Sequence, residues 1–255
     1  MTIKFTWNGD EYQVDLSDPI DISIPLMNGE QNQPNAYGAP LYEATPVQSG
    51  DFVGSLEAGS PVNFFNITLN PHGNGTHTEC VGHILQGPYS IRDSLRQSLF
   101  VAELISVQPE HAETGRTTFV TKAQLEPLVR YNTDVLIVRT IPNEEGKKTR
   151  KYTGTNPPWF SEAAMAWIAE MGYQHFLTDL PSVDPEVDGG ALAGHKAFWI
   201  VQGIVRTQCT ITELIYVPEN VPDGLYLLDL HTVALDLDVS PSRPMLYVIE
   251  KQNEN

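Results

Sequence analysis

The residues best suited to chemistry are gathered in one short segment of the chain. Three of the seven histidines, together with Glu79 and Cys80, fall within the 12 residues from His72 to His83. Imidazole and carboxylate groups together suit Zn, Mn or Fe. If the chain is extended here, His77 and Glu79 point to the same face, because side chains in a strand repeat every two residues. The residue types and their spacing therefore predict a metal site.

A glycine-rich turn comes directly before this pair of ligands. Gly73 and Gly75 let the backbone fold so that His72 can approach the same point. An isolated histidine is more often a surface or core residue, but three in a cluster with a carboxylate at alternating spacing favour a metal site. Cys80 lies in the same stretch, and we expect it to be a small buried thiol rather than a ligand.

A second carboxylate, Glu213, lies in the apolar stretch 209–217. Strand alternation would place it on one face with Ile211 and Ile215. If that face is buried, the carboxylate needs a cation, a metal or a proton, because an unpaired buried charge is costly. The opposite face, with Leu214 and Tyr216, would make an equally good core, so alternation alone leaves both interpretations open.

The elements that must position these residues are mostly strands. A hairpin is expected over residues 3–16, with Asn8-Gly9 as its turn. Further strands are expected at 20–24, 64–69, 99–107, 135–140, 176–178, 210–217, 225–230 and 245–249. Helices are expected at 121–130, where Thr121 can cap, and at 161–171, between Ser161 and Gly172.

The order of these elements bounds the fold class. No regular alternation of strands and helices is apparent, which favours a mixed α+β or α/β fold in one domain over residues 1–255. Residues 27–62 are rich in Gly, Pro, Asn and Gln, and a loop of this length in a compact domain is usually functional or covers a site.

Composition and charge exclude several classes of function. The net charge is −17, from 15 basic and 32 acidic residues, whereas binding to phosphates takes clustered Lys and Arg. No nucleic acid is therefore expected as a partner. No run of 18 apolar residues and no signal peptide is apparent, so we expect no membrane partner and a cytoplasmic location. The two cysteines, Cys80 and Cys209, fit a reduced compartment.

Several motifs together resemble the cyclase family of metal-dependent hydrolases, which includes kynurenine formamidase-like and isatin hydrolase-like enzymes. The family signature is close to His-x-Gly-Thr-His-x-Asp-x-Pro with a further histidine beyond it. Residues 75–79 match its centre, and His83 lies four residues after the acidic position. Residues 21–26 are similar to the family's opening strand, residues 179–185 to its Asp-x-x-Ser-x-Asp-Pro segment, and residues 240–244 to its C-terminal segment.

The resemblance implies a role for each site residue. Metal binding falls to the three signature positions, proton transfer to His83, and completion of the site or a second metal to two downstream residues. The implied ligands are His72, His77, Glu79, His195 and Glu213. Asp179, Ser182 and Asp184 are expected to orient ligands or to shape a turn.

The resemblance also implies a fold, a cofactor and partners. The fold would be a swivelling β/β/α domain, the cofactor a divalent metal (Zn or Mn), and the partner a small-molecule substrate. The assembly would be a homodimer or homotetramer. Three departures from the signature predict a divergent subgroup: Asn74 lengthens the first histidine spacing, Glu79 replaces the usual Asp, and Val81 replaces the usual Pro.

The expected reaction is hydrolysis of an amide, formamide, lactam or lactone by metal-activated water, with His83 as the proton-transfer group. One alternative is a lyase or dehydratase that uses the same metal to release water. The other is a metal- or ligand-binding protein on the same fold without catalysis, since a fold does not by itself imply a reaction.

Overall fold

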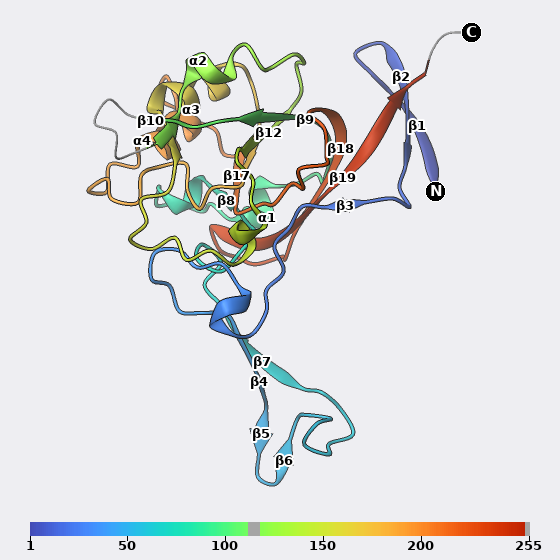
Figure 1. The fold of residues 1–255 in the computed structure, drawn as a ribbon, viewed down its shortest axis with the longest axis vertical. Helices are drawn as coiled ribbons and strands as arrows, with labels where there is room; N and C mark the ends of the chain where they lie inside the picture. The colour runs from blue at the N-terminus through green and yellow to red at the C-terminus, as the bar shows by residue number, and fades with distance from the viewer. Residues whose placement is uncertain (112–117, 253–255) are drawn as a thin grey trace.

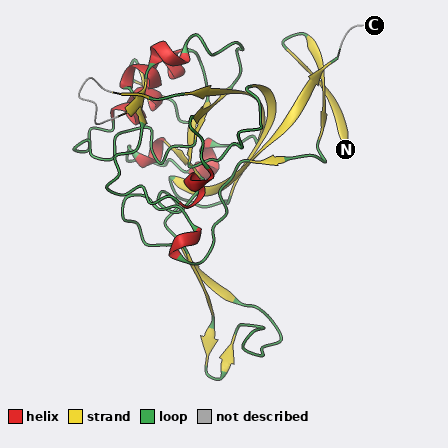
Figure 2. Cartoon of the chain, in the orientation of Figure 1, coloured by secondary structure: helices red, strands yellow, loops and turns green. Residues whose placement is uncertain are grey.

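The largest sheet of the computed structural model, which describes residues 1–111 and 118–252, has ten strands, and its N-terminal hairpin extends away from the body (Figures 1 and 2). The strands of this sheet are β1 (Thr2–Trp7), β2 (Asp10–Asp15), β3 (Ile20–Asp21), β8 (His77–Cys80), β9 (Leu99–Val107), β12 (Val135–Thr140), β14 (His175–Thr178), β17 (Thr210–Glu213), β18 (Gly224–Thr232) and β19 (Val239–Lys251). The mixed α/β class expected from the sequence is confirmed.

Part of this sheet closes on itself. The order β19-β18-β9-β12-β14-β17-β8 returns to β19, because β8 pairs with both β17 and β19. The long strand β19 makes the closure possible. Its first residues pair with β8 inside the ring, and its last residues pair with β2 of the N-terminal hairpin (Figure 1).

Four neighbouring strands, β9, β12, β14 and β17, are parallel. Each crossover between them carries a helix. The helices are α2 (Lys122–Leu125), α3 (Glu162–Glu170) and α4 (Ala193–Trp199). The structure thus has the regular βαβ alternation that the sequence analysis did not find. The reason is that α4 was not predicted. Helix α2 was predicted but is shorter than expected: it is a single turn, ended by the Glu126-Pro127 pair, where a helix to residue 130 was expected.

Alternating residues divide the core into two layers. On β12, Val135 and Ile137 pack toward the interior of the ring, with Leu104 and Leu228. Leu136 and Val138 of β12 face the other way and pack under α3 and α4, together with Phe176 of β14. All six residues of β12 are buried, as is usual for a parallel strand covered on both faces. Helix α3 is confirmed, with Ser161 as its N-cap and Gly172 at positive φ after its end.

An arm made of two short two-stranded sheets projects from the body (Figure 1). It replaces much of the irregular loop expected over residues 27–62. Its strands are β4 (Glu43–Pro46), β5 (Gln48–Ser49), β6 (Phe52–Val53) and β7 (Phe65–Thr68). β4 pairs with β7, and β5 with β6. Phe64, Phe65 and Ile67 are exposed on this arm.

The remaining elements are short. They are η1 (Glu30–Asn32), η2 (Val81–His83), α1 (Ile91–Ser94), β10 (Glu110–His111), β11 (Thr118–Val120), η3 (Glu145–Thr149), β13 (Trp159–Phe160), β15 (Ile200–Val201) and β16 (Ile204–Val205). Within the described ranges, no helix is long and apolar enough to cross a lipid bilayer.

Candidate metal centre

The turn before β8 is held by side chains as well as by glycine. The amide oxygen of Asn70 accepts the Gly73 N–H at 3.1 Å, and the amide oxygen of Asn74 accepts the Asn70 N–H at 2.6 Å. Asn74 also donates to the carbonyl of Pro40 at 2.8 Å and is 1% exposed. The residue that lengthens the spacing between His72 and the next histidine is therefore an integral part of the turn.

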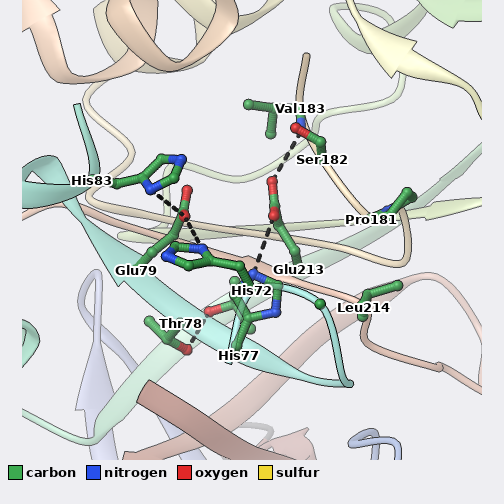
Figure 3. A network of polar contacts seen from close by, with 12 residues as sticks. His72, His77, Thr78, Glu79, His83, Pro181, Ser182, Val183, Glu213 and Leu214 are labelled. Carbon is green, nitrogen blue, oxygen red and sulfur yellow. Dashed lines mark hydrogen bonds and ion pairs between the residues drawn. The ribbon is translucent and has the colours of Figure 1, made fainter. Parts of the chain in front are cut away.

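Strand β8 places the next two candidate ligands, His77 and Glu79, on one face, as the alternation predicted. Glu213 lies directly opposite His77 in the antiparallel pairing with β17, and Glu79 pairs with Ile211. Thr78, between the two, points to the other side and contacts the Thr212 hydroxyl at 2.8 Å (Figure 3). β8 is therefore buried between β17 and β19, with His77 and Glu79 on the face opposite Thr78.

The contacts of His77 leave one ring nitrogen available to a cation. Its Nδ1 donates to the carbonyl of Gly75 at 2.8 Å, because a carbonyl oxygen only accepts. The lone pair of Nε2 then points toward the Glu213 carboxylate, 3.3 Å away. Nε2 is buried and has no hydrogen-bond partner among the described residues. A lone pair that faces a carboxylate at this distance is the arrangement that a metal ion between them would satisfy.

His195 repeats this arrangement on helix α4. Its Nδ1 donates to the Asp184 carboxylate at 2.5 Å, and its Nε2 lies 3.1 Å from an oxygen of Glu79. Asp184 also accepts the N–H of Gly194 at 2.6 Å, at the start of the helix. A Cβ on Gly194 would lie 3.0 Å from the carboxylate, so glycine permits this close approach. The expectation that Asp184 orients a ligand is consistent with these contacts.

His72 and His83 close the other side of the site. Nδ1 of His72 lies 3.2 Å from Glu79, and its Nε2 lies 3.2 Å from Asp238. Nδ1 of His83 lies 3.5 Å from Asp238 and 3.9 Å from Glu79. The rings of His72 and His83 are 4.4 Å apart (Figure 3).

The electrostatics of the site favour positive charge. Burial opposes an imidazolium, but Asp184 and Glu79 outweigh it and raise the pKa of His195 to about 10. Burial likewise opposes charge on His72, and Asp238 and Glu79 raise its pKa to about 10. Burial opposes the Glu79 anion too, yet hydrogen bonds from His195 and His72 hold its pKa well below the usual value. A divalent cation would compete with protons for these nitrogens.

The candidate ligand atoms lie close to one another. Donor atoms of His72, His77 and Glu79 all lie within 4.8 Å of one another, and so do those of Glu79, His83 and His195. Glu213 is 4.0 Å from Nε2 of His195 and also accepts the Val183 N–H at 3.0 Å. The structure thus brings together all five residues expected to bind metal, together with His83, and their roles remain a prediction.

A cavity of about 340 Å³ opens onto this cluster. Ala39 and Asn70, which flank the arm in the sequence, line this cavity, and so does Tyr37. Among the described residues that line the cavity there is no Lys and no Arg. The acidic side chains that line it are Glu79, Asp184, Glu186, Asp188 and Glu213. The charge environment therefore suits a cation and disfavours an anionic substrate that lacks one.

The sequence analysis misplaced one residue near the site and missed another. Asp179 does not face the cluster. It forms a buried ion pair with Lys147 at 2.6 Å and accepts hydrogen bonds from Thr140. Asp238 was missed, because no motif marks it and the β8–β19 pairing brings it to the site from 166 positions beyond His72.

The stretch 209–217 also differs from the simple alternation used to weigh Glu213. Leu214 has φ +55°, which ends β17 at Glu213 and interrupts the strand. Residues on both sides of it are buried, with Ile211 in the layer under the helices and Ile215 inside the ring. The expected strand to residue 217 was too long. Both alternatives assumed one continuous strand with a single buried face, and the structure fits neither of them.

Comparison with known proteins gives a consistent set of relatives. A model of the family described as "putative cyclase" matches residues 14–185. Kynurenine formamidase of Erythrobacter litoralis is 24% identical over 215 residues, which cover 82% of this chain and 88% of that protein.

Solved structures share the fold at lower identity. An isatin hydrolase bound to the product analogue thioisatinate aligns with a TM-score of 0.63 and 14% identity, covering 91% of this chain and 93% of that one. A potential metal-dependent hydrolase with cyclase activity aligns with a TM-score of 0.62 and 16% identity, covering 91% and 98%.

Proposed function

This chain belongs to the cyclase family, and from that premise we propose that it is a metal-dependent hydrolase acting on carbon–nitrogen bonds other than peptide bonds. The observation that carries the proposal is the pair of histidine nitrogens, Nε2 of His77 and Nε2 of His195, that face buried carboxylates at 3.3 Å and 3.1 Å. Their opposite ring nitrogens are held by hydrogen bonds to protein oxygens, which leaves these two for a cation.

The donor set supports zinc or manganese as the ion. The proposed ligands are imidazoles and carboxylates, without a thiolate: His72, His77, Glu79, His195 and Glu213. Cys80 is buried and free, and burial raises the pKa of its thiol, which disfavours a thiolate ligand. When bound, such an ion polarises a carbonyl and makes a nearby water more acidic.

His83 is the proposed proton-transfer residue. It lines the cavity, is partly exposed, and lies beside both His72 and His195, with ring centroids 4.4 Å and 5.3 Å away. From this place it accepts a proton as water attacks the carbonyl and returns a proton to the leaving nitrogen. A group with this role typically contributes ~100- to 10,000-fold in rate.

The lining of the cavity supports a small substrate with a neutral acyl group. The relatives are named for formamide and isatin hydrolysis, so formamides and lactams are the first classes to test, followed by other amides and lactones. A substrate anion would find neither Lys nor Arg among the described lining residues, and the cation would be its main counter-charge.

We also propose that the protein is a cytoplasmic homodimer or homotetramer. The exposed apolar side chains of the arm, Phe64, Phe65 and Ile67, support self-association, since a patch of this kind often marks an interface. The free, buried Cys80 and Cys209 are compatible with a reducing compartment. Sedimentation of the purified protein over a range of concentrations tests the assembly.

The reaction class is tested by following the oxygen of water. Protein loaded with zinc or manganese is incubated with aryl formamides and lactams in ¹⁸O-labelled water, and the products are analysed by mass spectrometry. Hydrolysis places one solvent oxygen in the carboxylate product. A chelator should abolish the reaction, and added metal should restore it. A product formed by loss of water, or turnover that survives complete removal of metal, would contradict the proposal.

A further inference from the structure

We infer that Asp238 is a positioning residue that fixes the ring orientation and the tautomer of both His72 and His83. One carboxylate oxygen, Oδ2, lies within reach of both rings, 3.2 Å from Nε2 of His72 and 3.5 Å from Nδ1 of His83. The inference rests on the proposed function, because it concerns how these two histidines serve the metal and the proton transfer.

The backbone around Asp238 is held from several sides. The carbonyl of Leu237 accepts the Ile91 N–H at 2.8 Å, and the carbonyl of Asp238 accepts the Cys80 N–H at 2.9 Å. The next residue, Val239, pairs with Glu79 across the β8–β19 ladder. Asp238 is therefore fixed relative to the strand that carries the proposed ligands.

A glycine makes room for this carboxylate. A Cβ added to Gly82 would lie 3.1 Å from the Cβ of Asp238 and 2.9 Å from the carbonyl oxygen of Tyr89. Both contacts are tighter than ordinary van der Waals distances, so a side chain at position 82 would displace the segment. The close approach between η2, which carries His83, and the start of β19 depends on this glycine.

For His72, the carboxylate of Asp238 selects the nitrogen that can bind metal. A neutral imidazole has one N–H and one lone pair. If the N–H is at Nε2 and donates to Asp238, the lone pair is at Nδ1, which faces Glu79 at 3.2 Å. Nδ1 is therefore the ligand atom, and the contact with Asp238 holds the ring plane. Carboxylates behind metal-bound histidines typically act in this way.

For His83, the same carboxylate selects the nitrogen that handles the proton. A proton at Nδ1 is directed at Asp238, which leaves the lone pair at Nε2. His83 and Asp238 then form a pair in which the carboxylate orients the imidazole and the free nitrogen accepts a proton. This is the relation between histidine and carboxylate in many acid–base sites.

The test uses Asp238→Ala with Asp236→Ala as its matched control. Asp236 lies two positions earlier in the same segment, is 80% exposed in its side chain, and pairs with Arg92 at 3.6 Å. Both variants remove one carboxylate from the same segment, so a general effect of charge or of the segment would appear in both.

The direct measurement is the tautomer of each histidine. Protein with ¹⁵N-labelled imidazoles is examined by long-range ¹H–¹⁵N correlation, loaded with zinc and free of metal. Wild type should show His83 protonated at Nδ1, and zinc-loaded His72 protonated at Nε2. Asp238→Ala should lose both tautomer preferences. It should also bind zinc 10- to 100-fold more weakly, or turn over 10- to 100-fold more slowly. Asp236→Ala should match wild type in all three measurements.

Two results would overturn the inference. The first is an Asp238→Ala protein with unchanged tautomers, zinc affinity and turnover. The second is wild-type His83 without a proton on Nδ1 in the zinc-loaded protein, because Nδ1 would then be bound to metal or directed elsewhere. The Nδ1 proton of His83 is also read in metal-free protein, so a wild type that fails to bind zinc would refute the proposed function separately.

Discussion

Replacing Asp184 by Asn tests how the protein prepares His195 for a metal. The Asp184 carboxylate accepts hydrogen bonds from Nδ1 of His195 at 2.5 Å and from the N–H of Gly194 at 2.6 Å. An Asn side chain keeps one acceptor oxygen, which can serve Gly194, but turns its NH₂ toward His195. The imidazole proton then moves to Nε2, the nitrogen that faces Glu79, and the metal must displace it.

The change removes two hydrogen bonds to the same carboxylate oxygen, from Nδ1 of His195 at 2.5 Å and from the backbone N–H of His195 at 3.2 Å. Changes behind a metal-bound histidine typically weaken metal binding ~10- to 100-fold, which is about 1.4–2.7 kcal/mol in binding free energy. Because the metal binds the folded state, its stabilisation against unfolding at a fixed metal concentration should shrink by about the same amount.

The assay is a zinc titration against a chromophoric chelator, with thermal unfolding measured with and without metal. Asp188→Asn serves as the control, since Asp188 accepts the N–H groups of Gly190 and Leu192 before α4, whereas the described hydrogen bonds and ion pairs of His195 go to Asp184, Glu79 and Glu213. Wild-type affinity in Asp184→Asn would refute the reasoning. Equal weakening in both variants would assign the effect to the loop rather than to the tautomer.

Three further changes probe other parts of the structure. His83→Ala should keep its metal and lose ~100- to 10,000-fold in turnover, as seen by elemental analysis alongside kinetics, and loss of the metal would count against its role in proton transfer. Asp179→Asn should destabilise the protein by about 3–5 kcal/mol in urea unfolding, because it leaves the buried Lys147 without its anion, and a much smaller loss would contradict the buried ion pair. Burial and Arg206 lower the pKa of His175 to about 4, so the folded state resists its protonation and stability is lost as pH falls below 6.5. Between pH 7 and pH 4 this loss is about 3 kcal/mol, and His175→Gln should flatten that part of the curve.

Much of the fold could be predicted from local patterns. The strands at 99–107 and 135–140 have the expected bounds, because long runs of apolar and β-branched residues are typical of buried strands. Helix α3 followed from its Ser161 cap and the glycine after it. These elements carry their signals within the segment itself.

Other elements depend on contacts that the sequence does not display. Helix α4 begins at a glycine-rich stretch without a side-chain cap of its own, and its first N–H groups bond to Asp184, ten residues earlier. The first part of β19 contains Pro241 and Pro244, which usually disfavour a strand, yet it closes the ring against β8. Its boundary was therefore placed too late.

In the candidate site, too, some residues could be predicted from local sequence patterns and others could not. His72, His77 and Glu79 lie so close in sequence that residue type and strand period were enough to bring them together. Grouping His195 and Glu213 with them required the family resemblance, and the structure brings them within 4.0 Å of each other. Asp238 has no local sequence pattern that marks it, because its position in the site depends on the pairing of β8 with β19, which closes the ring.

The central claim, that these residues form a metal site, is tested most directly by elemental analysis of protein purified without chelator or affinity metal. Wild type is compared with His77→Ala, which removes the nitrogen that faces Glu213. About one or two equivalents of zinc or manganese in wild type and little in the variant are expected for five ligands of this type. Full metal content in His77→Ala, or no metal in wild type after incubation with zinc and manganese, would contradict the account.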